Sequence, residues 1–271
     1  MLRKVYTALV AVSLIAPASV AGAEMNLWIS RHFSGIATYD QGQYQEAQGV
    51  LEAALNETKS KHRHAATLDQ LGQLQTALGR FDEAEKYYKE ALQEKEKSLG
   101  KKHRDVAETL NNLADMYYIT GKTEQCEPLY RRALAINERD QLNYEVCRSL
   151  NGLALLENDA NDKIECEKFL VRAINIHQKA QRRDQPYYAT VLTNLGILYT
   201  NTGRLSEAEA LFEKAEKVQK ETLRADHPDV ALRMHATAAL YQAQGKNNEA
   251  ATLAAAADAI RNKQLAAGNL Y

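Results

Sequence analysis

The sequence predicts an all-α protein, a solenoid built from about six helix-turn-helix units. A turn residue recurs along the chain at intervals of 37, 42, 40, 42 and 42 residues. Between the turns, large apolar residues are spaced by three and four, which is the period of one face of a helix. The turn residues are Gly42, Gly79, Gly121, Asn161, Gly203 and Gly245. Two apolar helical segments per repeat predict helical hairpins that bury their faces against neighbouring hairpins.

Small residues recur at three fixed positions around each turn. Seven residues before the turn stand Gly35, Gly72, Ala114, Ala154, Gly196 and Ala238. Five residues after it stand Ala47, Ala84, Cys126, Cys166, Ala208 and Ala250, and twelve after it Ala54, Ala91, Ala133, Ala173, Ala215 and Ala257. Two helices approach closely only where side chains are small, so these positions predict repeated crossing points.

The units follow in order from the N-terminus. We expect them at residues 26–60, 61–101, 102–141, 142–183, 184–225 and 226–263, with a tail at 264–271. Glycine suits the turn because a left-handed residue ends the first helix, and Asn161 is the next most tolerant choice. Asp105 with Glu108 forms a capping-box pattern that opens the third unit. Pro128 falls about five residues into a second helix, which predicts a late start or a slight distortion there.

The first 23 residues read as a secretory signal peptide and are excluded from the fold. Leu2-Arg3-Lys4 is basic, Val5 to Ala16 is apolar, and Ala21-Gly22-Ala23 is an A-x-A cleavage pattern. The alternative is an uncleaved signal anchor, although the apolar run is short for a membrane span. We therefore expect an exported bacterial protein that is periplasmic or secreted and has no membrane span after cleavage of the signal peptide.

The repeats resemble a known family. The stretches "LNNLADMYYITGKTEQCEPLYRRAL" and "LTNLGILYTNTGRLSEAEALFEKA" resemble tetratricopeptide repeats, whose signature includes L-G-x2-Y and A-x3-F. The matching residues are Leu195, Gly196, Tyr199, Ala208 and Phe212. The period of about 42 residues and the linkers "SLGKKHRDVA" and "TLRADHPDVA" resemble the kinesin light chain class of these repeats. Over residues 26–263 the resemblance implies a right-handed superhelical solenoid.

Two motifs suggest chemistry but have simpler explanations. Gly121-Lys122-Thr123 matches the end of a phosphate loop, yet Met116 stands where that loop needs glycine, and a helix precedes it. His62, His64, His103 and His227 are potential metal ligands, but they fall in the predicted linkers without a carboxylate set beside them. We therefore predict neither a nucleotide site nor a metal site.

The three cysteines occupy positions that hold alanine in other units. A buried free thiol behaves as a small apolar side chain, so Cys126, Cys147 and Cys166 fit such positions. Cys126 and Cys166 lie at equivalent points of successive units, too far apart for a disulfide. A Cys126–Cys147 pair is left open.

A partner-binding surface is the predicted functional site. The first helices are expected to line the concave side of the solenoid. Their remaining polar residues include Gln70, Gln73, Asn111, Asn112, Asp115, Arg148, Asn151 and Asn194. Side-chain amides offer donors and acceptors together, so they match the backbone of an extended peptide. The resemblance implies the same use for inner-helix asparagines, with Asn112 and Asn194 the closest matches.

Composition excludes other classes of function. The chain has 34 lysines and arginines against 35 aspartates and glutamates, which gives no basic excess for nucleic acid. No catalytic motif stands out, so we expect no enzyme activity and no cofactor. The expected function is a protein-interaction scaffold for a protein or peptide partner. The alternative is a self-assembling structural spacer of an envelope complex, because the alanine-rich segment "NEAATLAAAADAI" offers a surface for a homo-oligomer.

Overall fold

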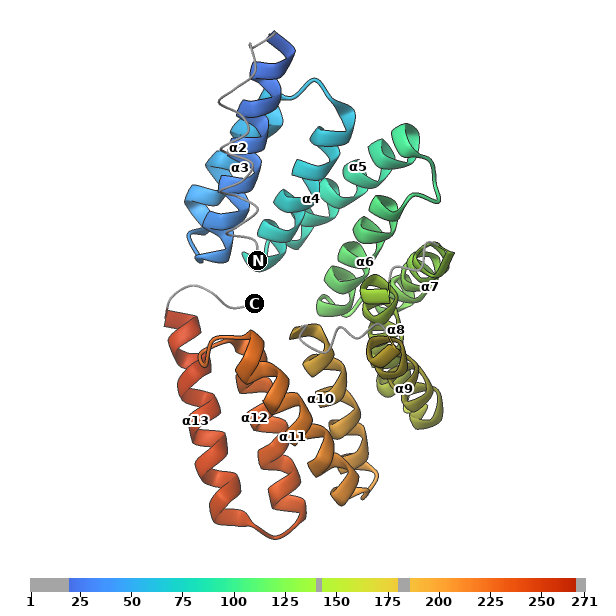
Figure 1. The fold of residues 1–271 in the computed structure, drawn as a ribbon, viewed down its shortest axis with the longest axis vertical. Helices are drawn as coiled ribbons and strands as arrows, with labels where there is room; N and C mark the ends of the chain where they lie inside the picture. The colour runs from blue at the N-terminus through green and yellow to red at the C-terminus, as the bar shows by residue number, and fades with distance from the viewer. Residues whose placement is uncertain (1–19, 140–142, 180–185, 267–271) are drawn as a thin grey trace. The chain divides into compact units, whose positions relative to one another are not determined.

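The computed structural model describes residues 20–139, 143–179 and 186–266 (Figure 1). These residues form twelve α-helices and no strand, which confirms the all-α class with helix-turn-helix units. The helices are α2 (Val20–Asp40), α3 (Tyr44–Glu57), α4 (Lys61–Ala77), α5 (Phe81–Leu99), α6 (Arg104–Ile119), α7 (Thr123–Arg139), α8 (Asn143–Asp159), α9 (Lys163–Lys179), α10 (Pro186–Asn201), α11 (Leu205–Thr222), α12 (Pro228–Ala243) and α13 (Asn247–Ala266).

Some sequence predictions fall on residues that lie outside the described ranges. These predictions concern residues 1–19 of the signal peptide, residues 267–271 of the tail, and the unit boundaries at 141/142 and 183/184. The predicted cleavage site after Ala23 lies within α2. The signal peptide therefore stays a prediction.

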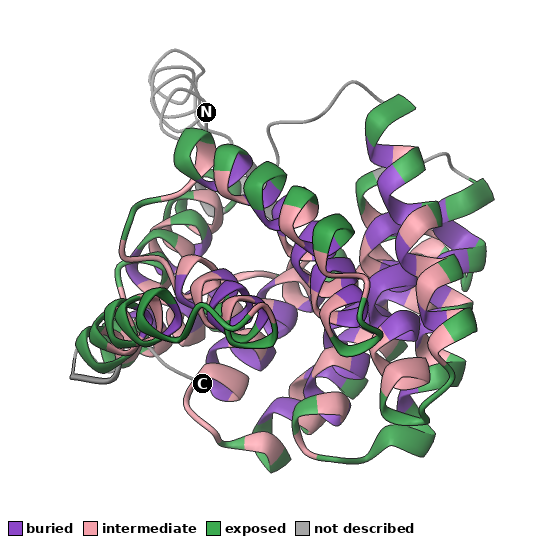
Figure 2. Cartoon of the chain, turned by 90° about the horizontal axis from the view of Figure 1, so that it is seen from below, coloured by how far each residue is buried: buried purple, intermediate pink, exposed green. Residues whose placement is uncertain are grey.

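The described chain divides into two compact units, residues 20–112 and 113–266. In the first unit, α4 contacts α2, α3 and α5. In the second unit, α10 contacts α8 and α12 as well as α9 and α11. The first helices of successive hairpins are thus neighbours in the second unit. Buried residues lie mainly on the faces that packed helices present to one another (Figure 2).

The turns have the conformation that the repeat predicts. The six turn residues all have positive φ, and Asn161, at 64°, is the one residue other than glycine with positive φ in the described chain. After Gly121, the amide of Lys122 donates to the carbonyl of Tyr117 at 2.9 Å, which closes the end of α6. Gly121-Lys122-Thr123 is therefore a helix end and the start of α7, as predicted in place of a phosphate loop.

The glycines before the turns allow close approach of two helices. A Cβ on Gly72 would lie 2.6 Å from the ring of Tyr88, and one on Gly196 would lie 2.5 Å from the ring of Phe212. In each pair the aromatic ring belongs to the second helix of the same hairpin. The prediction that small residues mark helix crossing points is confirmed at these positions.

Pro128 does not delay its helix. The helix α7 begins at Thr123 and continues to Arg139 with the proline inside it, so the predicted late start is wrong. Proline has no N–H, so the carbonyl of Glu124, four residues earlier, loses its usual helical donor. The first turn of α7 also differs from that of α5. In the equivalent turn of α5 the amide of Ala84 donates to Arg80, four residues earlier. In α7 the carbonyl of Lys122 accepts from the amide of Gln125, only three residues later, at 3.0 Å.

One buried position near the end of the second helices is polar in four successive units. It is occupied by Lys95, Asn137, His177 and Gln219. Lys95 donates to buried Asp69, to Thr109 Oγ1 at 3.0 Å and to the carbonyl of Asp105 at 3.2 Å. Thr109 Oγ1 also donates to Asp69 Oδ2 at 2.8 Å. These bonds link α4, α5 and α6 within the first unit.

Candidate functional site

A connected group of polar side chains lies on the first helices α6, α8 and α10 and on the second helix α7, within the second unit. We call it the Arg148 cluster. It consists of Asp115, Tyr130, Arg148, Asn151, Tyr187 and Asn194. Four of these residues were predicted from the sequence, and the two tyrosines were not.

An ion pair between Arg148 and Asp115 forms the centre of the cluster. Arg148 on α8 donates to Asp115 Oδ2 on α6 at 2.5 Å. The hydroxyl of Tyr130 donates to the other carboxylate oxygen at 2.6 Å. Burial opposes the charge on Arg148, but nearby Asp115 outweighs it and raises the pKa of the guanidinium. The side chains of Arg148 and Asp115 are 20% and 40% exposed, so solvent or a partner reaches both.

Packing explains why Tyr130 points into this cluster. Tyr130 stands at the register of Tyr88 and Phe212, whose rings lie over glycines of their own hairpins. Its own hairpin carries Ala114 at that crossing point. The ring of Tyr130 lies instead against Gly152 on α8, where a Cβ would collide with it. The sequence does contain a signal for this contact, namely the glycine at this position, where the neighbouring units have a side-chain amide.

An amide pair extends the cluster to α10. Asn194 Nδ2 donates to Asn151 Oδ1 at 2.8 Å. The hydroxyl of Tyr187 donates to the carbonyl of Arg148 at 3.5 Å, and its ring packs edge-on against Tyr144 at 5.6 Å. Burial raises the pKa of Tyr187 well above its ordinary value, so the phenol stays neutral. Asn151 is buried, whereas Asn194 is partly exposed beside it.

The predicted binding residues of the first unit have different environments. Gln70 and Gln73 on α4 are half-buried. Asn111 and Asn112 on α6 are buried, Asn111 completely. Contact of these four side chains with a partner stays a prediction.

All three cysteines are free, buried thiols. The pair left open, Cys126 and Cys147, is not bonded, and each thiol instead donates to a backbone carbonyl, of Ala114 at 3.5 Å and of Ala173 at 3.3 Å. Burial raises the pKa of Cys126 to about 11 and that of Cys147 to about 12. Buried, protonated thiols are poor nucleophiles, which fits their use as small apolar side chains.

The histidines predicted in linkers divide into two groups. His103 and His227 do precede helices, and the Nδ1 atom of each accepts from the backbone amide two residues later, at 3.2 and 3.1 Å. His62 and His64 lie within α4, so their assignment to a linker is wrong. The reason is that α4 begins at Lys61, where the backbone of Ser60 already accepts from the amide of His64 at 2.9 Å.

Among the described residues, no helix is both long and apolar enough to cross a membrane.

The family model of the tetratricopeptide repeat matches residues 28–93, 63–139 and 145–221. A search of curated protein sequences gives no match.

Several solved structures are similar to the chain. A Podosopora anserina kinesin light chain with nearly identical TPR-like repeats is 23% identical, covering 76% of this chain and 99% of its own, with a TM-score of 0.56. BtubC (BKLC) from P. vanneervenii is 20% identical over 88% and 92%, at 0.60. A Rap protein complexed with competence and sporulation factor is 13% identical over 89% and 77%, at 0.67. At these identities the similarity shows the shared fold.

Proposed function

Because the chain belongs to the tetratricopeptide repeat family, we propose that it is a protein-interaction scaffold that binds an extended segment of a partner protein at the Arg148 cluster. Helical repeat arrays present extended surfaces on their inner helices, which suit peptide segments. The similar Rap protein is complexed with competence and sporulation factor, and thus binds a partner on a related fold.

The observation that carries the proposal is the continuity of the cluster across three first helices. Asp115, Arg148 and Asn194 come from α6, α8 and α10, and each is at least partly exposed. Buried Asn151 and Tyr130 hold them from below through bonds of 2.8 and 2.6 Å. Donors fixed before binding lose less rotamer freedom on complex formation.

The chemistry of the cluster suits a peptide backbone. One amide hydrogen of Asn194 bonds to Asn151. In the proposed complex, the second hydrogen of this carboxamide donates to a backbone carbonyl of the partner, and its Oδ1 accepts from a backbone amide of the partner. The guanidinium of Arg148 carries a positive charge and its side chain is 20% exposed, so it attracts an acidic side chain nearby. We propose a preference for segments with an acidic residue close to the bound backbone.

Peptide selection with the full chain tests this function. A random peptide library displayed on phage is selected against the purified protein, and affinities of the selected peptides are measured by calorimetry. Asn194→Ala is expected to weaken binding about tenfold, because a hydrogen bond of about 1.4 kcal/mol is lost. Asn175→Ala is the matched control, since Asn175 is an exposed amide on the second helix α9.

Equal affinities of wild type and Asn194→Ala for every selected peptide contradict the proposed site. Loss of affinity in Asn175→Ala as well indicates a general change in the solenoid. Both variants are compared with wild type by thermal unfolding, because only variants with unchanged unfolding temperatures report on binding.

We further propose that the scaffold acts after export, in a periplasm or outside the cell. The basic, apolar and small-residue pattern of residues 1–23 supports this location. The expected result of N-terminal sequencing of the protein from its native host is a chain that begins at Glu24. A mature chain that retains Arg3 and Lys4 contradicts cleavage.

A further inference from the structure

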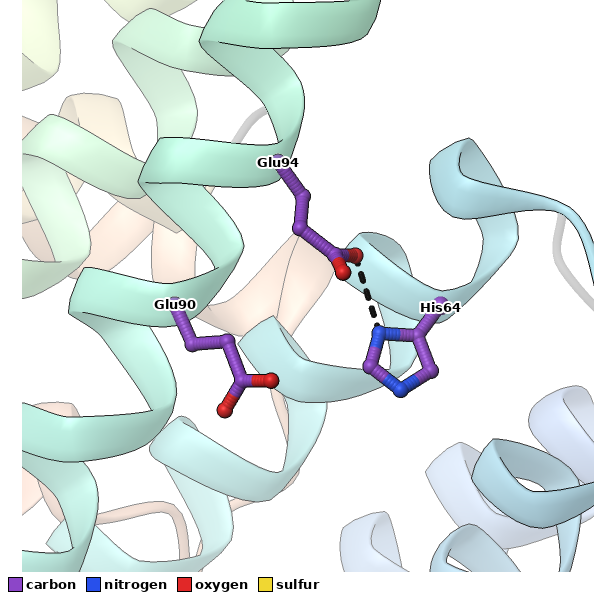
Figure 3. Close-up of side chains that lie close together, drawn as sticks. All are labelled: His64, Glu90 and Glu94. Atoms are coloured by element: carbon purple, nitrogen blue, oxygen red, sulfur yellow. Dashed lines mark hydrogen bonds and ion pairs between the residues drawn. The ribbon is translucent and has the colours of Figure 1, made fainter.

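We propose that His64, Glu90 and Glu94 form a binding site for a divalent transition-metal ion, with Zn²⁺ as the best candidate. His64 lies in the first turns of α4, and both glutamates lie on α5, within the first unit (Figure 3). His64 Nδ1 lies 2.9 Å from Glu94 Oε2. One ligand atom from each residue lies within 4.8 Å of the other two. No other such group occurs within the part of the chain that the structure describes.

The repeat itself makes these residues unusual. In the third, fourth and fifth units, the register of His64 holds Val106, Val146 and Tyr188, all buried. The register of Glu94 in those units holds Ile136, Ile176 and Val218.

A hydrogen-bonded polar pair thus replaces an apolar contact in this unit. Glu90 departs from the pattern as well, because its register holds Arg132, Arg172 and Lys214 in the same three units. The hydrogen bond between His64 and Glu94 accounts for two of these departures, and a common ligand accounts for all three.

The ligand set suits zinc. Imidazole nitrogen and carboxylate oxygen bind Zn²⁺ at about 2.0–2.2 Å, so two ligand atoms on one ion lie at most about 4.4 Å apart. The observed 2.9 Å between His64 and Glu94 already meets this limit. Glu90 is exposed, so a small rotation of its side chain brings its carboxylate within reach of the ion.

Charge favours a cation at this point. Glu90 and Glu94 are four residues apart on one helix face, where like charges repel. Their carboxylates point towards the imidazole of His64, as Figure 3 shows. A divalent ion relieves that repulsion and leaves a fourth position for water or for a side chain of a partner.

Calorimetry and thermal unfolding of the full chain with ZnCl₂ test the site. We expect one Zn²⁺ per chain and an unfolding temperature that rises with Zn²⁺ concentration, because an ion that binds only the folded state stabilises it. Glu90→Gln is expected to weaken binding at least tenfold without harming the fold, since Glu90 is exposed. His62→Gln is the control, because His62 lies on the same helix outside the group, and binding is expected to persist.

The double variant His64→Val with Glu94→Ile guards against a misfolded negative result. It copies Val106 and Ile136 of the next unit, so the fold is expected to persist while the Zn²⁺-dependent rise in unfolding temperature disappears. Absence of Zn²⁺ binding by the wild type overturns the proposal. So does binding that is unchanged in Glu90→Gln or in the folded double variant.

Discussion

Replacing Lys95 by Asn is expected to lower the free energy of unfolding by about 3–5 kcal/mol at pH 7.5, because it leaves the buried carboxylate of Asp69 without its counter-ion. Both side chains are about 3% exposed, so water cannot take the place of the ammonium group. Thr109 retains its bond to Asp69 Oδ2 but carries no charge. Urea denaturation monitored by circular dichroism measures the loss.

The next hairpin provides a control for this prediction. At the registers of Asp69 and Lys95 it carries the buried residues Asn111 and Asn137. The double variant Asp69→Asn with Lys95→Asn copies these two neutral residues, and we expect it to recover most of the lost stability. A double variant as unstable as Lys95→Asn alone shows that the charge of Asp69 is not the cause.

Acidification gives a second measurement of the same effect. Burial raises the pKa of Asp69 from 3.8 to about 6, while Lys95 opposes the shift. Without Lys95 the pKa rises further, and the folded state takes up a proton before the unfolded state does. Because the folded-state pKa is raised, this group favours folding below its ordinary pKa and loses that contribution as the pH rises through the folded value. The cost of Lys95→Asn is therefore expected to shrink between pH 7.5 and pH 4.5.

Gly196→Ala is expected to lower the free energy of unfolding by about 1–2 kcal/mol. The added methyl group lies 2.5 Å from the ring of Phe212, and overpacking of this kind costs about 1–3 kcal/mol. Alanine regains about 0.5–1 kcal/mol through its better helix propensity. Urea denaturation again measures the net effect.

The fourth unit shows how the same crossing accepts alanine. There, Ala154 and Leu170 occupy the registers of Gly196 and Phe212, and both are buried. In a Phe212→Leu background, Gly196→Ala is therefore expected to cost nothing, which a double-mutant cycle detects as coupling. If the losses in free energy of unfolding are additive in the cycle, the strain does not arise from contact with the Phe212 ring.

Most of the fold follows from the sequence because the repeat fixes it six times over. Spacing of turn residues predicted every hairpin, and the left-handed conformation of Asn161 followed from its place in the glycine register. The predicted late start at Pro128 was wrong, since α7 begins at Thr123 and includes the proline. Periodicity records what the units share and says little about a single substitution.

The candidate site was harder to predict from the sequence, because it depends on single residues that the units do not share. Polarity on the first helices identified Asp115, Arg148 and Asn194, but it also selected Asn111, which is fully buried. The part played by Tyr130 depends on a displacement of its ring from Ala114 towards Gly152, which no local pattern records. Likewise, His64 and Glu94 are 30 residues apart and meet only through the antiparallel pairing of α4 and α5.

The varied polar residue near the end of each second helix bears on how a chain of similar hairpins assembles in order. Lys95 donates to Thr109 and to the carbonyl of Asp105 in the next hairpin. At the same register, Gln219 donates to the carbonyl of Asp229 and accepts from Arg233 in its next hairpin. A hairpin docked on the wrong neighbour would bury an ammonium or a carboxamide without its partner, at about 1–3 kcal/mol for each group. Hairpins with purely apolar contacts could dock on any other hairpin of the chain. A buried polar group that lacks its partner destabilises such wrong arrangements, in which a unit is skipped or exchanged during folding.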